Sequence, residues 1–274
     1  DGALNFVLDS LSDTSLAQSG VDFDGSAEAD FFDGADTDVV LNLAGNAGSD
    51  TLIGGSGNDT LRGGADNDSL SGSDGDDLLV GDLGDDFLDG GEGQDTADYS
   101  AAAGAVSVDL GVFSAQDTVS AGMDTLVNVE SVIGTNFDDD LSAGNAGGVL
   151  DGREGNDVLT GGDGWDALSG GAGNDTLIDT AGNGNLQGNA GDDHIDGRAS
   201  YHSDPSAVFV NYTDAALDVH GDGSLILAAR TGQDGHGDTD TFGASAQSLE
   251  GSGFADLLFG SDMNNRILGR AGDD

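Results

Sequence analysis

Residues 45–98 read GNAGSDTLI GGSGNDTLR GGADNDSLS GSDGDDLLV GDLGDDFLD GGEGQDTAD, which are six consecutive segments of nine residues. The sixth position of every segment is Asp, and the eighth is Leu in the first five segments and Ala97 in the last. A second run of such segments occupies residues 134–196, and every eighth position there is Leu or Ile. A motif that recurs in phase over this many segments indicates a repeat architecture.

The period of nine residues suits neither an α-helix nor a simple alternating strand, whereas a six-residue turn followed by a three-residue strand accounts for it. Glycine at positions 1, 2 and 4 allows the positive φ angles that tight turns need. The middle side chain of a three-residue strand points to one face, and here that residue is the Leu. Two segments then form one coil of 18 residues. We therefore predict an all-β fold, a parallel β-roll (β-solenoid) of tandem nonapeptide repeats around leucine ladders.

The composition indicates which partners such a roll accepts. The chain has 53 acidic residues against six basic ones, a net charge of -47, and 36% hydrophobic residues. A compact state with this charge repels itself unless cations neutralise it, so divalent cations are expected partners and nucleic acid is not. The regular placement of the hydrophobic residues argues against a disordered acidic chain. No apolar run of about 18 residues is present, so we expect no membrane span.

The segments resemble the RTX (haemolysin-type) calcium-binding repeats of type I-secreted bacterial proteins. Residues 54–62 and 170–178 match every fixed position of the pattern G-G-x-G-x-D-x-U-x. The resemblance implies that sixth-position Asp side chains and turn carbonyls bind calcium between turns 18 residues apart, and two Asp plus several carbonyls suit the six to eight oxygen ligands of Ca²⁺. The alternative is that these side chains only cap turns. The metal ligands implied are Asp50, Asp59, Asp68, Asp77, Asp86, Asp95, Asp139, Asp157, Asp175 and Asp193.

The two runs differ in how many edges of the roll carry stacked Asp. In residues 45–98 both edges are complete, so we expect four calcium ions there. In residues 134–196 one edge carries an unbroken column of four Asp, whereas the other reads Gly148, Asp166 and Gly184. We therefore expect three ions along one edge of the second run, and none at Asp166.

Two spacers interrupt the period but resemble each other. Tyr99 and Tyr201 each precede a Val-x-Val motif by seven residues, and Asp124 in its Asp-Thr-Leu motif corresponds to Asp240 in Asp-Thr-Phe. We expect each spacer to extend or cap its roll as β structure. The predicted organisation is the end of a spacer at residues 1–24, a roll block at 25–98, a spacer at 99–133, a second block at 134–196, a spacer at 197–250 and the start of a third block at 251–274.

No catalytic pattern emerges from the sequence. The many Gly-x-Gly pairs never complete a dinucleotide-binding motif, and no Lys is present for a phosphate-binding loop. We therefore predict that the chain is not an enzyme and that its one cofactor is Ca²⁺.

The resemblance implies a secreted, extracellular or cell-surface protein. Its expected function is that of a calcium-dependent structural or adhesive segment which folds after export and whose partners include a cell surface or polysaccharide. The alternatives are an accessory roll of a secreted protease, lipase or alginate epimerase, and the receptor-binding repeat region of a toxin. Because the chain stops at GRAGDD (residues 269–274), a turn without its strand, we expect a larger parent protein.

Overall fold

A computed structural model describes residues 2–7, 20–145, 147–179, 181, 184–201, 209–211, 217–218, 226–227, 231–233, 239–242, 248–259 and 266–270. All regular elements among them are β-strands. The chain divides into two compact units, residues 1–135 and 136–274. In the described ranges no helix is long and apolar enough to cross a membrane.

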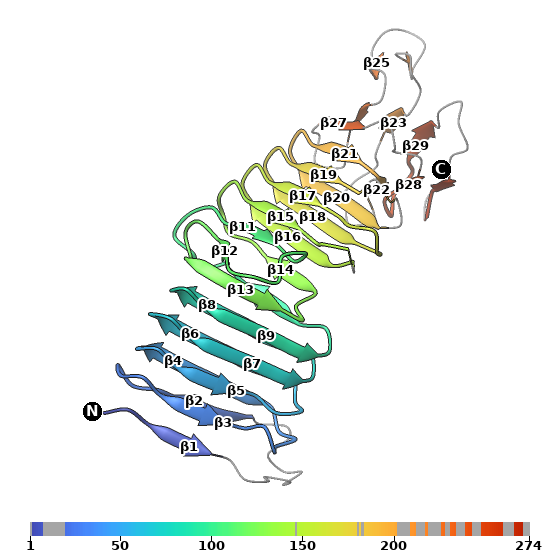
Figure 1. Ribbon diagram of the computed structural model, residues 1–274. Coiled ribbons are helices and arrows are strands. Elements are labelled where there is room, and N and C mark those ends of the chain that lie inside the picture. Colours follow the sequence, from blue (N-terminus) through green and yellow to red (C-terminus); the bar gives the residue numbers. More distant parts are fainter. Residues whose placement is uncertain are drawn as a thin grey trace. The chain divides into compact units, whose positions relative to one another are not determined.

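Unit 1 contains two sheets of parallel strands (Figure 1). One sheet has the order β1 (Asn5–Val7), β3 (Phe31–Asp33), β5 (Thr51–Ile53), β7 (Ser69–Asp74), β9 (Phe87–Glu92) and β13 (Met123–Val127). The other has the order β2 (Val21–Asp24), β4 (Leu41–Ala47), β6 (Thr60–Ala65), β8 (Leu78–Leu83), β10 (Thr96–Asp98) and β14 (Ser131–Ile133). Successive strands mostly alternate between the sheets, so each coil gives one strand to each. The predicted parallel β-roll is confirmed.

The core of unit 1 consists of the predicted leucine ladders. Leu52 pairs with Leu70 and Leu70 with Leu88, a register of 18 residues, and all three side chains are buried. Strands β6 to β9 have six residues rather than the expected three. The reason is that the backbone at the start of the next turn stays extended and pairs again, as Gly64 does with Asp82.

The first spacer continues both sheets of unit 1, as predicted. Strand β13 pairs with β9 through Thr125 and Phe87, and β14 pairs with β10 through Ser131 and Thr96. Val132 of β14 is buried and adds a rung to the core. Between β10 and β13 lie β11 (Ser107–Asp109) and β12 (Gln116–Asp117), and β12 pairs antiparallel with β13.

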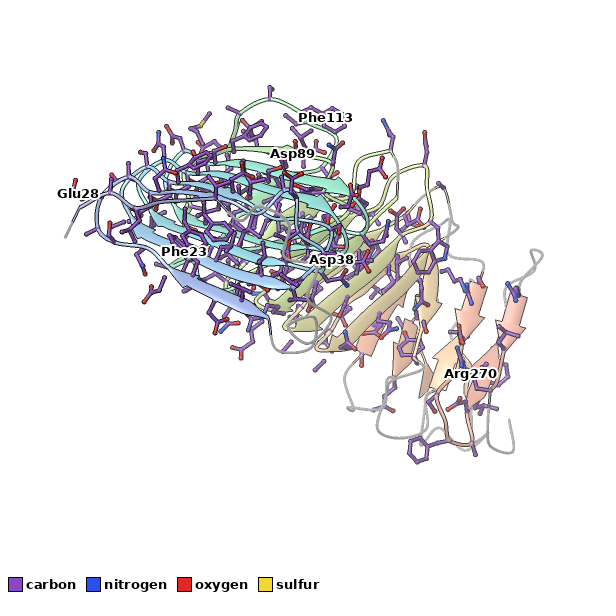
Figure 2. The ribbon with its side chains drawn as sticks, turned by 90° about the horizontal axis from the view of Figure 1, so that it is seen from below. Phe23, Glu28, Asp38, Asp89, Phe113 and Arg270 are labelled. Carbon is purple, nitrogen blue, oxygen red and sulfur yellow. The ribbon has the colours of Figure 1, made fainter. Side chains whose placement is uncertain are left out.

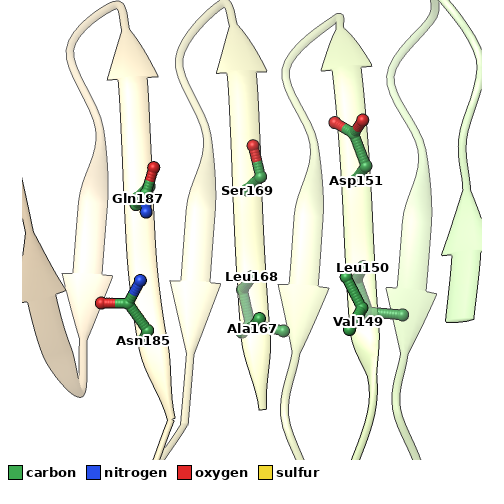
Figure 3. A pocket seen from close by; sticks show the side chains of 8 residues that line it. All are labelled: Val149, Leu150, Asp151, Ala167, Leu168, Ser169, Asn185 and Gln187. Carbon is green, nitrogen blue, oxygen red and sulfur yellow. The ribbon is translucent and has the colours of Figure 1, made fainter. Parts of the chain in front are cut away.

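Unit 2 repeats the arrangement. One sheet contains β15 (Asp140–Ser142), β17 (Val158–Thr160), β19 (Thr176–Ile178), β21 (His194–Asp196) and β27 (Thr239–Phe242). The other contains β16 (Val149–Glu154), β18 (Ala167–Ala172), β20 (Asn185–Ala190), β22 (Arg198–Ser200), β28 (Ser248–Glu250) and β30 (Arg266–Leu268). Figure 3 shows β16, β18 and β20 side by side, with Asp151, Ser169 and Gln187 in register.

The second spacer also extends its roll. Strands β22 and β28 continue one sheet and β27 the other, and Leu249 of β28 is fully buried. Strand β27 pairs antiparallel with β26 (Thr231–Gln233), which pairs with β23 (Phe209–Asn211). Strand β23 pairs parallel with β29 (Leu257–Phe259), and β24 (Leu217–Asp218) pairs with β25 (Ile226–Leu227).

Residues 1–24, predicted as the end of a spacer, supply β1 and β2 to the two sheets of unit 1. An aromatic cluster lies here, because the ring of Phe23 is 4.9 Å from that of Phe32 and 6.3 Å from that of Phe6. Figure 2 labels Phe23 on this coil, and also Phe113, whose side chain is 70% exposed in the first spacer. The predicted end of a third block includes residues 271–274, which lie outside the described residues.

Candidate metal centres

The sixth-position Asp side chains form columns at the turns. Each carboxylate leans toward the preceding coil, where its Oδ1 accepts the backbone N–H of the Asp one coil earlier, at 2.7 or 2.8 Å. The structure thus brings together the pairs predicted 18 residues apart, and all of these side chains are buried. The columns are Asp50–Asp68–Asp86 and Asp59–Asp77–Asp95 in unit 1 and Asp139–Asp157–Asp175–Asp193 in unit 2.

The second carboxylate oxygen distinguishes stacked Asp from others. Within the described ranges, buried Oδ2 atoms without a hydrogen-bond partner include those of Asp50, Asp68, Asp77, Asp86, Asp95, Asp157 and Asp175. Each of these has another Asp one coil earlier. By contrast, Asp59 and Asp166 have no Asp before them in their columns, and their Oδ2 atoms accept the N–H groups of Gly55 at 2.7 Å and Gly162 at 3.0 Å.

A buried carboxylate oxygen without a donor is costly, roughly 1–3 kcal/mol or more for a charged group. The cost falls on the stacked pairs and not on Asp59 or Asp166, whose turns fold back to supply a donor. A cation beside the stacked carboxylates would remove this cost. The unpartnered oxygens are therefore the structural sign of a missing positive charge in each pair.

Backbone oxygens face the same narrow space. A Cβ added to Gly72 would collide with Asp77 Oδ2 and would lie 2.6 Å from the Gly90 carbonyl oxygen of the next coil. A Cβ on Gly75, where φ is +123°, would collide with the Gly57 carbonyl oxygen. Glycine thus keeps open a space lined by carboxylate and carbonyl oxygens, and a donor set made wholly of oxygen suits Ca²⁺.

The side chains alone are too few to enclose an ion. No group of three or more His, Cys, Asp and Glu side chains converges within the part of the chain that the structure describes. Each stacked pair offers two carboxylates, so the remaining ligands of a calcium ion would come from the backbone carbonyls of the glycine-rich turns. The donor set thus fits the one that the sequence predicts.

The pKa values of the stacked carboxyls are strongly raised. Burial, together with neighbouring carboxylates, raises the pKa of Asp68, Asp77, Asp86 and Asp157 from 3.8 to about 7. Burial likewise raises the pKa of Asp95 and Asp175 to about 6. Near neutral pH these groups hold protons unless a cation takes their place.

Calcium affinity is expected to fall as the pH drops from 7.5 to 5.5. Since the folded pKa values exceed 3.8, protonation stabilises the metal-free roll fully below about pH 4, and this contribution is lost as the pH rises through 6 and 7. Calcium must displace these protons, so binding at pH 6.5 should also release protons. Calorimetric titrations in two buffers of different ionisation enthalpy test this. A calcium affinity that is independent of pH over this range contradicts it.

Asp30 belongs to the first column, although it was missing from the predicted ligands. Its N–H donates to Asp50 Oδ1 at 2.6 Å, and its own Oδ2 accepts the N–H of Ser26 at 2.5 Å, as in the other turns that begin a column. The spacing of 20 residues hides it from a search at 18. Its position as the sixth residue of the weaker copy GSAEADFFD (residues 25–33) is the signal that could have found it.

A second ladder, also missed, runs along the outside of the turns at the fifth position. The Asp76 N–H donates to Asn58 Oδ1 at 3.0 Å, and the Gln94 N–H donates to Asp76 Oδ1 at 3.0 Å. In unit 2 the ladder follows the complete Asp column, from Asp138 through Asn156, Asn174 and Asp192. The other edge has Gly147 and Trp165 at the fifth position, which offer no such acceptor.

The two edges of residues 134–196 should therefore differ in bound calcium. Asp157 and Asp166 are equally buried, and Oδ1 of each accepts an N–H from one coil earlier, at 2.8 and 2.9 Å. Asp157→Asn is expected to bind two calcium ions fewer per chain, because Asp157 belongs to two stacked pairs, whereas Asp166→Asn should lose none. Equilibrium dialysis with radioactive calcium measures both. Equal losses would show that other oxygens complete the second edge.

Comparison with protein families identifies the repeats. The model of the RTX calcium-binding nonapeptide repeat (4 copies) matches residues 42–70, 62–97, 142–177, 178–200 and 248–274. The matches cover just over half of the chain. A comparison with curated proteins gives no significant match. RTX nonapeptide repeats bind calcium and form a structural, non-catalytic β-roll. On these repeats and their stacked aspartates, the chain belongs to the RTX calcium-binding nonapeptide repeat family.

Proposed function

We propose that this chain is a calcium-dependent extracellular structural segment, adhesive in role, of a larger secreted protein, and that it folds on calcium binding after export. Its stacked aspartates, from Asp50 to Asp95 and from Asp139 to Asp193, together with Asp30, would hold the ions. The observation that carries the proposal is the buried Oδ2 without a donor in the stacked pairs.

Folding and calcium binding should be one event. The core is thin, because each nonapeptide contributes one leucine, as Leu61 and Leu70 do, and such burial does little to offset the entropy of ordering nine residues. Without a cation the stacked carboxylates repel one another and keep their cost of burial. Bound calcium supplies positive charge and joins adjacent coils through their oxygens. Metal binding then provides the free energy of folding.

The tandem organisation supports a mechanical role. Both spacers continue the sheets of their units, so blocks and spacers together form long β-rolls without separate globules. We propose that the boundaries at 25, 99, 134, 197 and 251 mark successive roll blocks and spacers of one array. Such an array would extend from a surface, which suits an adhesive segment.

A calcium titration followed by far-ultraviolet circular dichroism tests the proposed function. Extracellular calcium-binding modules have dissociation constants of roughly 10⁻⁴–10⁻³ M. The chain should therefore be unfolded at cytosolic calcium and gain its strand signal cooperatively in that range. A strand-rich spectrum already present in excess chelator would contradict the proposal.

A further inference from the structure

The first spacer places a buried tyrosine against the last carboxylate of a column. Asp124 continues the column of Asp86, since its Oδ1 accepts the Asp86 N–H at 3.0 Å. Its Oδ2, however, accepts the hydroxyl of Tyr99 at 3.1 Å, and the Thr118 hydroxyl oxygen lies 3.1 Å away. Asp124 is fully buried and Tyr99 nearly so.

The second spacer repeats this contact in unit 2. Asp240 Oδ1 accepts the Asp193 N–H at 3.1 Å, and the Tyr201 hydroxyl donates to Asp240 Oδ2 at 2.7 Å. Both side chains are buried. The sequence separation between the paired carboxylates is 38 residues in one spacer and 47 in the other. The same contact thus forms in two spacers of different length, so it is a feature of the spacer design.

These two aspartates differ from the stacked ones in one respect. In Asp68, Asp77 and Asp86 the oxygen Oδ1 is bonded to the preceding coil, and Oδ2 has no hydrogen-bond partner among the described residues. Asp124 and Asp240 keep the first interaction, but a tyrosine of their own spacer takes the second oxygen. A hydroxyl donor therefore stands at the oxygen that the repeats leave for calcium.

We infer that Tyr99 and Tyr201 end the calcium columns, each donating a hydrogen bond that replaces the ion at the last carboxylate. The inference rests on the proposed function, because it assumes calcium between the preceding pairs. A hydroxyl satisfies a buried carboxylate oxygen without bringing charge, and it needs no exposed glycine carbonyls. The spacer can thus close a roll with ordinary side chains and polypeptide of irregular spacing.

The test removes the donors and counts calcium on the full chain. The double variant Tyr99→Phe/Thr118→Val leaves Asp124 Oδ2 without hydroxyl donors and should bind one calcium ion more per chain than the unchanged protein. Asp124→Asn should bind the same number as the unchanged protein, because Asp124 is not a ligand. Thr37→Val is the matched control, since the buried Thr37 hydroxyl bonds to the Gly34 carbonyl oxygen at 2.9 Å and should not affect the number.

Equilibrium dialysis at saturating calcium gives the numbers, and circular dichroism at the same concentration verifies folding. A folded double variant with an unchanged number overturns the inference, and so does the loss of one ion in Asp124→Asn. If the double variant does not fold, Asp124→Asn decides alone: an unchanged number supports the inference. Absence of calcium binding by the unchanged protein would instead refute the proposed function, so the two failures are distinguishable.

Discussion

Magnesium supplied in place of calcium is expected to leave the repeats unfolded at concentrations where calcium folds them completely. Mg²⁺ demands near-ideal octahedral ligands at about 2.0–2.1 Å and gives up its water reluctantly. The carboxylates here are fixed by backbone hydrogen bonds, such as that from the Asp59 N–H to Asp77 Oδ1, and the carbonyls by the stacking of coils. The oxygens therefore cannot contract around a smaller ion.

Parallel titrations with the chloride salts, followed by circular dichroism, measure this difference. Sodium chloride at equal ionic strength is the control for simple screening of the charge of -47. Folding by magnesium at the same concentrations as calcium, or folding by sodium chloride alone, would show that charge neutralisation rather than specific ligation holds the coils together.

Leu70→Ala is expected to lower the free energy of unfolding by about 2–5 kcal/mol at saturating calcium. Leu70 is fully buried and lies in register between Leu52 and Leu88, so neighbouring rungs cannot move to fill the cavity without breaking their own pairing. The matched control is Leu83→Ala, whose side chain is 58% exposed, and its effect should stay within about 0.5 kcal/mol.

Urea unfolding at saturating calcium measures both variants. Leu70→Ala should also raise the calcium concentration needed for folding, since binding must then supply more of the free energy. Similar stabilities of Leu70→Ala and Leu83→Ala would mean that the leucine ladder contributes little beside the metal.

The sequence predicts most of this fold because its period links each residue to a fixed place in a coil. Once Leu61 and Leu79 are known to be 18 residues apart, their parallel register follows, and so does the stacking of Asp59 on Asp77. The asymmetry of the second run is visible for the same reason, as Asp166 interrupts a series of glycines.

Features outside the period could not be predicted in this way. The similarity of the spacers points to Tyr99 and Asp124, but 25 residues of irregular sequence separate them, and no rule of spacing says that they touch. Asp30 falls outside because two extra residues break the step of 18. The return of the Gly55 N–H to Asp59 depends on the absence of an Asp one coil earlier, which is a property of the stack and not of the turn.

The central claim is that calcium occupies the stacked pairs, and diffraction from calcium-saturated crystals tests it most directly. Anomalous scattering from calcium should give a peak in the space between the two carboxylates of every stacked pair. It should give none at Asp166, Asp124 or Asp240. The pairs are Asp30–Asp50, Asp50–Asp68, Asp59–Asp77, Asp68–Asp86, Asp77–Asp95, Asp139–Asp157, Asp157–Asp175 and Asp175–Asp193. Columns without anomalous peaks in a folded, calcium-saturated protein would contradict the account.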